Sequence, residues 1–376
     1  MKIISTISRV LLVLLVPLLL PFSATAHNNR NIGAVYTMTN AVDGNKVLMF
    51  SRGHTGKLTA AGEFLTGGLG TGAGLGNQGA LILDPENRWL FVVNAGTDDI
   101  SVFAVEHQGL TLVDRVASNG ELPISLSYSR NLLYVLNAGG NVGSTDSISG
   151  FRVASDGTLS AIPGSSRPLS AAATDPAQVQ FNGDGDVLVV TEKGTSLIDT
   201  FILDADGAPG TANSQLSVGV TPFGFAFGKR DQLFVSEAAG GAPGQGSVSS
   251  YGLSKDGTLN VISPAEATTE TAACWVVVSN DGRFAYTTNA GSGSVSGYRI
   301  GFDGDISLLN HNGRTGLTGK DSTPLDMALS NDGRNLYTLN AGNATISAFR
   351  VGHKGGLHRL RTLKNLPATV NGLAAR

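Results

Sequence analysis

The sequence predicts an all-β protein that folds as a single seven-bladed β-propeller with four-stranded antiparallel blades. The chain of 376 residues is 41% hydrophobic but only 15% charged, and its 50 glycines suit a protein with many turns. One segment, residues 279–291, recurs almost unchanged as residues 330–342. Related segments occur seven times along the chain, at a spacing typical of propeller blades rather than of helical solenoids.

Each repeat carries the same hairpin signal. In residues 279–291, an Asn-Asp-Gly turn precedes an aromatic and β-branched run, and Asn-Ala-Gly follows it. Asn, Asp and Gly tolerate the positive φ angles of short hairpins, and the run between the turns has the composition of a strand. For this repeat we expect four strands, from the innermost to the outermost, at residues 275–278, 284–288, 294–300 and 306–309.

The N-terminal segment is assigned to targeting rather than to the fold. Lys2 and Arg9 precede an apolar run, and Ala-Thr-Ala at residues 24–26 supplies the small residues of a cleavage site. We therefore expect a signal peptide over residues 1–26 and a propeller over residues 27–376, in a secreted or periplasmic protein. The apolar run is too short to span a bilayer comfortably, so no membrane insertion of the mature chain is expected.

Charge and cysteine content narrow the classes of partner. The formal net charge is −3, and removal of the two basic residues of the signal peptide makes it −5. A mildly acidic chain without basic runs is not expected to bind nucleic acid. The single cysteine, Cys274, excludes an intrachain disulfide and has no His or Lys beside it in the sequence, so we expect a buried, inert thiol. We expect the mature protein to be a monomer.

The last residue of the second strand marks each repeat. Its seven positions are spaced by 43 to 55 residues: Asn40, Asn94, Asn137, Glu192, Glu237, Asn289 and Asn340. The first repeat begins with its second strand, at residues 33–40, and lacks an innermost strand. Residues 366–373 match the innermost-strand segments of other repeats, such as residues 122–126 and 221–225. We therefore expect the C-terminal strand to complete the N-terminal blade and close the ring, which removes exposed sheet edges.

Propeller geometry separates two kinds of connection. Loops from the second to the third strand, and from the outermost strand to the next blade, lie on one face, here called the top face. The other turns lie on the opposite, bottom face. The expected top-face loops are long, for example residues 67–79 and 310–324, whereas the bottom-face turns are short Asp-Gly turns. Because binding residues gather on variable loops held by a rigid scaffold, we expect the functional site on the top face.

Two motifs resemble ligand-binding loops but stand in the wrong context. The glycine-rich run at residues 68–76 is similar to a dinucleotide-binding loop, yet no helix follows it to receive a phosphate. We interpret it as a flexible top-face loop. Residues 182–186, Asn-Gly-Asp-Gly-Asp, are similar to the start of a calcium loop but lack the distal Glu. We interpret them as a hairpin turn, with a metal site as the alternative.

Histidine-based catalysis has a single candidate. His54, His107 and His353 fall in turns between the third and fourth strands, on the rim of the bottom face. Only His311, in the loop at residues 310–324, is expected on the top face. A mechanism that uses histidine would therefore have to use His311.

Carboxylates provide the main candidate for a catalytic site. Glu192 and Glu237 replace the recurring Asn in two adjacent repeats, where a carboxylate offers no obvious gain for folding. We expect both to share one pocket at the channel mouth with Gln178 between them, so that one carboxylate activates water and Gln178 donates to a carbonyl oxygen. Calcium is the alternative occupant of this acidic pair; otherwise no cofactor and no metal is expected.

Other polar residues at the same end of the channel are candidates for ligand binding. They come from the innermost strands or from the end of the second strands: Ser125, Asn137, Asn289, Asp326 and Asn340. The alternative is a structural role, in which the asparagines cap the following turn and the remaining side chains are solvated by channel water.

The repeats resemble the seven-bladed lactonase family, which includes propeller-type phosphogluconolactonases and fungal carboxymuconate cyclases. The likeness extends from about residue 32 to the end of the chain and rests on the Asp-Gly-Arg and Tyr-Thr-Leu-Asn-Ala-Gly motifs. In the fourth repeat, Pro176 and Glu192 match a family segment in which Pro is followed by Arg-His and, one strand later, by Glu. Ala177 and Gln178 replace that Arg and His, which removes a clamp for a carboxylate or phosphate.

The register of this match leaves open which position of the repeat Glu192 occupies. A one-residue slip in the hairpin would place Glu192 at the position of Ala290 instead of Asn289. The resemblance implies a lactonase-like hydrolase or isomerase that acts on a small lactone. The alternative is a non-catalytic propeller scaffold that binds a protein or another extracellular ligand through its top face.

Overall fold

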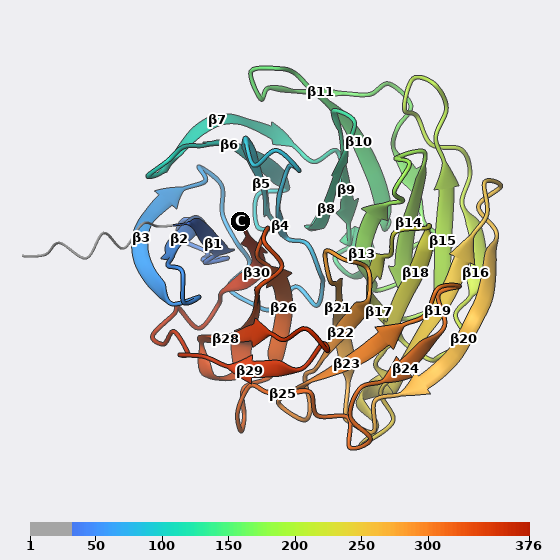
Figure 1. Ribbon diagram of the computed structural model, residues 1–376. Helices are drawn as coiled ribbons and strands as arrows, with labels where there is room; N and C mark the ends of the chain where they lie inside the picture. The colour runs from blue at the N-terminus through green and yellow to red at the C-terminus, as the bar shows by residue number, and fades with distance from the viewer. Residues whose placement is uncertain (1–31) are drawn as a thin grey trace, which may run out of the picture.

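The computed structural model of the protein describes residues 32–376. Their strands form seven antiparallel sheets, arranged as blades around a central channel (Figure 1). The only helices among these residues are three single 3₁₀ turns, η1 (Gly139–Asn141), η2 (Ala239–Gly241) and η3 (Ala341–Asn343). The predicted all-β, seven-bladed propeller is confirmed. The predicted signal peptide, residues 1–26, and the first residues of the expected domain 27–376 lie outside the described residues.

Each blade has four main strands, named from the innermost to the outermost. Blade 1 consists of β30 (Asn371–Ala375), β1 (Gly33–Met38), β2 (Lys46–Arg52) and β3 (Leu58–Leu65). Blade 2 consists of β4 (Leu81–Leu83), β5 (Trp89–Asn94), β6 (Asp99–Val105) and β7 (Leu110–Ala117). Blade 3 consists of β8 (Pro123–Ser129), β9 (Leu132–Asn137), β10 (Ser147–Val153) and β11 (Leu159–Ala161), with β12 (Arg167–Pro168) also paired to β10.

The remaining four blades follow the same order. Blade 4 consists of β13 (Pro176–Phe181), β14 (Val187–Glu192), β15 (Leu197–Ile202) and β16 (Asn213–Leu216). Blade 5 consists of β17 (Pro222–Phe227), β18 (Gln232–Glu237), β19 (Ser247–Leu253) and β20 (Leu259–Ala267). Blade 6 consists of β21 (Ala273–Val278), β22 (Phe284–Asn289), β23 (Ser294–Ile300) and β24 (Ile306–Leu308), with β25 (Gly316–Leu317) also paired to β23. Blade 7 consists of β26 (Pro324–Leu329), β27 (Asn335–Asn340), β28 (Thr345–Val351) and β29 (Leu357–Arg359).

The strands predicted for the sixth repeat agree closely with the structure, since β21 begins at Ala273 instead of residue 275 and the other bounds differ by at most one residue. The second strand of each blade is buried along most of its length; β14 and β22 are buried at every position. Such a strand lies between two neighbouring blades and is covered on both faces. This position explains its continuous apolar and β-branched sequence.

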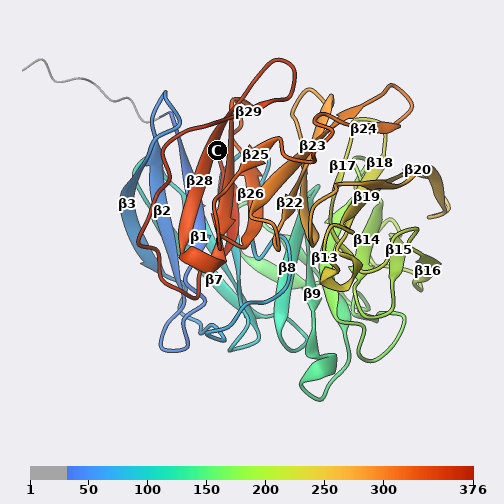
Figure 2. The same ribbon diagram turned by 90° about the horizontal axis from the view of Figure 1, so that it is seen from below.

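The C-terminal strand closes the ring as predicted. β30 pairs with β1, with Ala375 opposite Val35, and the Arg376 N–H donates to the Ala34 carbonyl oxygen at 2.8 Å. The buried guanidinium of Arg52 adds a hydrogen bond from Nε to the carbonyl oxygen of Arg376, at 3.2 Å. The observed strand starts at Asn371, later than the start of the matched stretch at residue 366. Figure 2 shows the blades in a view turned by 90° from that of Figure 1.

Buried tyrosines form hydrogen bonds between successive blades. Tyr134, Tyr286 and Tyr337 occupy equivalent positions in the second strands of blades 3, 6 and 7 and are fully buried. Each hydroxyl donates, at 2.6–3.0 Å, to the carbonyl oxygen of a glycine in a bottom-face turn of the next blade: Gly207, Gly355 and Gly56, respectively. The recurring Tyr of the repeat and its Asp-Gly turn are therefore two halves of one contact between blades. A buried phenol needs such a hydrogen-bond partner.

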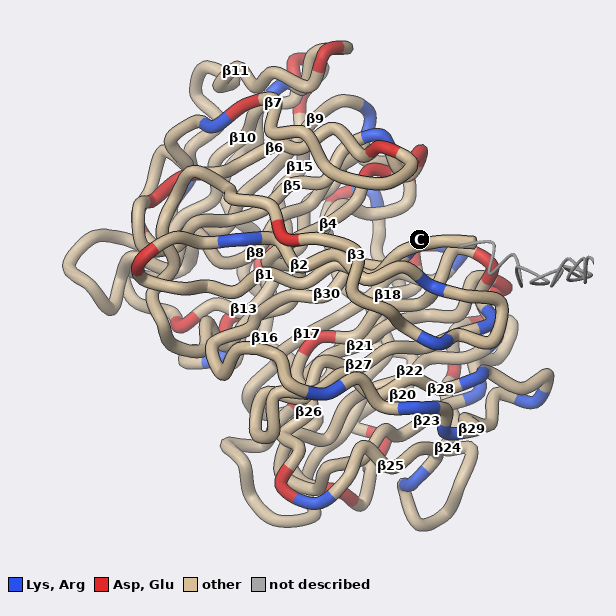
Figure 3. Tube along the Cα trace, turned by 90° about the vertical axis from the view of Figure 1, so that its left-hand side faces the viewer, with Lys and Arg blue, Asp and Glu red and all other residues tan. Residues whose placement is uncertain are grey.

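Charged residues of both signs are intermixed along the chain trace (Figure 3). Within residues 32–376, no helix is long and apolar enough to cross a membrane.

Candidate functional site

A cavity of about 500 Å³ lies along the channel, and residues from the innermost strands of all seven blades line it. One end is formed by Gln78 and Gly79, which precede β4. The other end reaches the bottom-face turns that contain Asn87 and Asn331. Most lining residues near the first end, Gln78 among them, are buried, whereas several near the second end are partly or fully exposed. The channel is therefore open toward the bottom face, not toward the top face where we expected the functional site.

The glycine-rich loop closes the top of the channel. Gln78 donates from Nε2 to the Val276 carbonyl oxygen at 2.8 Å and accepts the Val276 N–H at Oε1 at 3.0 Å. The indole N–H of Trp275 donates to the carbonyl oxygen of Asn77. Gly79 has a φ of 82°, a conformation that strongly favours glycine. The loop that we interpreted as a flexible connection is thus held by hydrogen bonds to the far side of the channel.

Lys193 also holds the glycine-rich loop in place. It is a residue of this site that the sequence analysis does not identify. Its side chain is 9% exposed, and Nζ donates to the Gly76 carbonyl oxygen at 2.6 Å. Nζ also forms an ion pair with Asp175 at 3.2 Å and lies 4.8 Å from the centre of the Phe223 ring. Burial lowers the pKa of Lys193, and Asp175 opposes this shift. The equivalent residue of every other repeat is alanine: Ala41, Ala95, Ala138, Ala238, Ala290 and Ala341. A lysine at a position that is alanine in the other six repeats is the sequence signal that could have identified this residue.

Each innermost strand has one edge that is not paired with another strand. Polar side chains form hydrogen bonds to some of the peptide groups on this edge. Gln178 accepts the Phe225 N–H at Oε1 at 2.7 Å and donates from Nε2 to the Phe225 carbonyl oxygen at 2.9 Å. The Ser125 hydroxyl accepts the Val179 N–H at 3.2 Å. These side chains take the place of a further strand, because buried peptide groups must be hydrogen-bonded. Gln178 and Ser125 therefore connect neighbouring blades through their side chains.

Asp326 lies at the closed end of the channel and lines the cavity. Its Oδ1 accepts the Met327 N–H at 2.8 Å, and its Oδ2 accepts those of Gly79 and Leu373 at 3.2 and 3.3 Å. Burial raises the pKa of Asp326 to about 7, although the three N–H groups favour the ionised form. Among the predicted ligand-binding residues, Asp326 is the one that lines this cavity, and its carboxyl group can exchange a proton near neutral pH.

Gln180 places an amide group in the cavity. It is half-buried and lines the channel two residues after Gln178 on β13. Its Oε1 accepts a hydrogen bond from Nε2 of Gln178 at 3.2 Å. Within residues 32–376, the amide nitrogen of Gln180 donates no hydrogen bond, so it is free to donate to a ligand.

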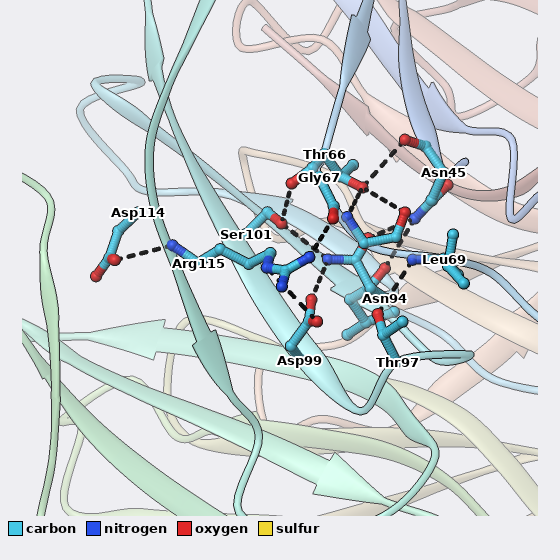
Figure 4. Close-up of polar contacts among 12 residues, drawn as sticks. Asn45, Thr66, Gly67, Leu69, Asn94, Thr97, Asp99, Ser101, Asp114 and Arg115 are labelled. Carbon is cyan, nitrogen blue, oxygen red and sulfur yellow. Dashed lines mark hydrogen bonds and ion pairs between the residues drawn. The ribbon is translucent and has the colours of Figure 1, made fainter. Parts of the chain in front are cut away.

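The recurring Asn at the end of the second strand belongs to a network inside its blade, as Figure 4 shows for blade 2. Asn94 donates from Nδ2 to Asp99 at 2.6 Å and to Ser101 at 2.8 Å. Its Oδ1 accepts a hydrogen bond from Asn45 of blade 1 at 2.9 Å, and Arg115 forms an ion pair with Asp99 at 3.7 Å. The Asn side chain therefore joins the second and third strands instead of pointing into the channel.

The other asparagines follow this pattern. Asn289 and Asn340 each donate to two hydroxyl groups on the third strand of their own blades, and Asn137 donates to one at 3.4 Å. The acceptors are Ser294 and Ser296, Thr345 and Ser347, and Ser149. All three asparagines are fully buried, and none lines the channel cavity. The asparagines therefore have a structural role, but they bond to the third strand instead of capping the following turn.

The structure does not bring Glu192, Glu237 and Gln178 together. Glu192 accepts hydrogen bonds from Ser170 in the loop that leads into β13, and Glu237 accepts one from Ser247 inside blade 5. Neither carboxylate lines the channel cavity, whereas Gln178 does. The expectation of one shared pocket fails because each carboxylate is buried among hydrogen-bond donors of its own strand ends and loops, outside the channel cavity.

His311 lies away from the channel. It is exposed, in the segment that connects β24 to β25, and both of these strands pair with β23 as the outer part of blade 6. Figure 1 shows β24 and β25 at the rim of the molecule. His311 therefore lies on the outer edge of blade 6 instead of in a top-face loop, because residues 306–317 first run along β23 before the chain turns inward.

Cys274 is a buried free cysteine, as expected, and burial raises the pKa of its thiol to about 12.

The turn at residues 182–186 is closed by the Asn182 side chain, which accepts the N–H groups of Asp186 and Val187, each at 3.0 Å. This is the hairpin turn that we preferred over a calcium loop. Within residues 32–376, no cluster of three or more His, Cys, Asp or Glu side chains that could hold a metal ion is found.

The fold and the channel cavity define a seven-bladed propeller with an axial cavity, and sequence comparison identifies its family. The profile of the family "Lactonase, 7-bladed beta-propeller" matches residues 43–144 and 191–324. This match covers more than half of the chain, so the protein belongs to this lactonase propeller family. No curated protein sequence matches the chain.

Solved structures share the fold at low sequence identity. The periplasmic gluconolactonase of Pseudomonas aeruginosa is 16% identical, with a TM-score of 0.73 over 91% of this chain and 99% of that one. A Bacteroides fragilis protein that is provisionally named a 6-phosphogluconolactonase is 18% identical, with a TM-score of 0.69 over 92% and 98% of the two chains. A protein from Lactobacillus plantarum is 15% identical, with a TM-score of 0.73 over 92% and 99%. At these identities, the likeness establishes the fold and not the activity.

Proposed function

We propose that the protein hydrolyses a small, uncharged lactone in the channel cavity. Membership of the lactonase propeller family supports the reaction class. The observation that carries the proposal is Asp326, a buried carboxyl group with a pKa raised to about 7, at the closed end of a cavity of about 500 Å³. A general base is most effective when its pKa lies near the working pH.

The chemistry follows from two side chains. The ionised Asp326 carboxylate takes a proton from a water molecule, and the water oxygen bonds to the lactone carbonyl carbon. The ring C–O bond then breaks, the alkoxide takes up the proton held by Asp326, and a hydroxy acid leaves. The free amide N–H of Gln180 donates to the carbonyl oxygen while negative charge develops there. General-base catalysis of this kind contributes roughly 10²–10⁴-fold to the rate.

The charge of the cavity favours an uncharged substrate. Its lining contains two carboxylates, Asp84 and Asp326, and no Lys, Arg or His. A phosphorylated lactone would place its anion near these carboxylates without a cationic partner, which disfavours binding. The similarity to a periplasmic gluconolactonase supports the same choice.

Export of the protein is also a proposal. Residues 1–26 have the pattern of a secretory signal, and we infer that the mature protein acts in the periplasm or outside the cell. Cell fractionation of the full chain and of a variant without residues 2–26 tests this; equal cytoplasmic retention of both would contradict it.

A panel of neutral and phosphorylated lactones tests the activity. Acid release by the purified mature protein, followed by pH-stat, should exceed the spontaneous rate for at least one neutral lactone and not for the phosphorylated ones. The Gln180→Leu variant should lose at least about 10-fold of this rate, as expected for a lost oxyanion donor. Gln108→Leu, at an exposed glutamine outside the channel, should keep it. If no lactone is hydrolysed, the protein is instead a non-catalytic propeller scaffold.

A further inference from the structure

Blade 4 departs from the network that holds the second and third strands of the other blades. In blade 6, Asn289 donates to Ser296, seven residues later, at 2.8 Å. The corresponding residues of blade 4 are Glu192 and Asp199. An amide donor and a hydroxyl acceptor are thus replaced by two carboxylates, which together contain no obligatory donor.

Both carboxylates of blade 4 are fully buried. Neither oxygen of Asp199 has a hydrogen-bond partner among residues 32–376. Two hydroxyl groups surround the other member of the pair: Ser170 Oγ and Thr195 Oγ1 each lie 2.5 Å from Glu192 Oε2. The site therefore gathers carboxylate and hydroxyl oxygens around an unpartnered buried carboxyl group.

No basic side chain neutralises this pair within the described residues. Neither Glu192 nor Asp199 forms a salt bridge there, and the neighbouring Lys193 is paired with Asp175. The carboxyl group of Asp199 is adjacent to that of Glu192. Two adjacent buried carboxyl groups need either a shared proton or a bound cation, because both cannot stay ionised without compensation.

We propose that blade 4 binds a calcium ion between Glu192 and Asp199. Two bidentate carboxylates and the hydroxyl oxygens of Ser170 and Thr195 offer up to about six ligands, and calcium takes six to eight oxygens in flexible geometry. The two hydroxyls donate to Glu192 in the structure and would rotate to present their lone pairs to the ion. This site differs from the acidic pair predicted from sequence, because its second carboxylate is Asp199 instead of Glu237.

The ion would stabilise the top face of blade 4. Ser170 belongs to the loop that leads into β13, and Thr195 belongs to the loop between β14 and β15. The ion would connect these two loops through Glu192, beside Lys193, which fastens the glycine-rich loop to the channel. The proposal is independent of the lactonase proposal, since neither carboxylate lines the channel cavity.

Calcium titration of chelator-treated protein tests the proposal. Isothermal titration at pH 7.5 should show one saturable calcium site, and the melting temperature should rise by a few degrees at saturating calcium because the ion binds only the folded state. The double variant Glu192→Asn/Asp199→Ser installs the Asn–Ser pair of blade 6. It should fold and lose at least about 100-fold of the calcium affinity.

Two further variants keep the test decisive. Glu237→Gln, which removes the other buried glutamate of this series, should retain the calcium response. Asp199→Asn removes one carboxylate with little change in shape and should lose the response even if the double variant folds poorly. Absence of calcium binding to the parent protein at 10 mM calcium, or unchanged binding in the Asp199→Asn variant, would overturn the proposal and leave a shared proton as the account of this pair.

Discussion

Glu237→Gln should make the protein more stable, and only at high pH. Glu237 is fully buried in blade 5, and its Oε1 has no hydrogen-bond partner among residues 32–376. Burial raises the pKa of Glu237 from 4.5 to about 7, although Ser247, Ser249 and the backbone of Gly219 favour the ionised form. Five of the seven repeats place a neutral Asn at the equivalent position. The neutral Gln side chain keeps the acceptor for Ser247 and adds a donor.

The magnitude follows from the shift of the pKa. The difference between 4.5 and about 7 corresponds to about 3 kcal/mol, at roughly 1.4 kcal/mol per pKa unit. Because the folded pKa is the higher one, the folded protein retains a proton that the unfolded chain releases. This contribution to stability is fully present below pH 4.5 and is lost as the pH rises through 7. At pH 8, the variant should gain up to about 3 kcal/mol over the parent protein, whereas at pH 4.5 the two should be similar.

Denaturant unfolding at pH 4.5 and pH 8 measures this difference directly. Glu121→Gln is the matched control, because Glu121 is exposed and its side chain makes no hydrogen bond in the described chain. The control should show the same stability difference from the parent protein at both pH values. An equal difference for Glu237→Gln at the two pH values would refute the assignment of a buried, protonated Glu237.

Three further outcomes are expected. Deletion of residues 371–376 should cost more than about 3 kcal/mol or prevent folding, because it removes the innermost strand of blade 1; chemical denaturation measures it. Lys193→Ala should speed amide hydrogen exchange in the loop at residues 67–79, whereas Lys255→Ala, at an exposed lysine, should not. Cys274 should react with a thiol reagent no faster than the protein unfolds, since its thiol is buried and its pKa is raised to about 12; rapid labelling at pH 8 would contradict this.

The fold could be predicted because its signals are local and repeated. Turn residues such as Asn-Asp-Gly at positions 280–282 determine a hairpin within a few residues, and seven copies determine the architecture. Ring closure could also be predicted, since the first repeat lacks an innermost strand and the C-terminal sequence supplies one. The tyrosine-to-glycine contacts between blades explain why Tyr286 and its equivalents recur.

The site could be predicted only in part. Asp326 was recognised as a polar residue of an innermost strand, but the direction of the Glu192 and Glu237 side chains depends on how the second strand lies in its blade. Closure of the channel depends on contacts such as that between Gln78 and Val276, which are 198 residues apart. No local pattern contains such a contact. Lys193 was detectable by comparing the repeats with one another.

The pH dependence of lactone hydrolysis tests the central claim most directly. For the substrate identified from the panel, the rate should rise with pH through an inflection near 7, where Asp326 ionises. The Asp326→Asn variant should lose roughly 100-fold or more of the rate, together with the inflection, and Asp303→Asn, at an exposed aspartate, should retain both. A folded Asp326→Asn variant with the full rate, or a parent profile without an inflection near 7, would contradict catalysis by Asp326 in the channel.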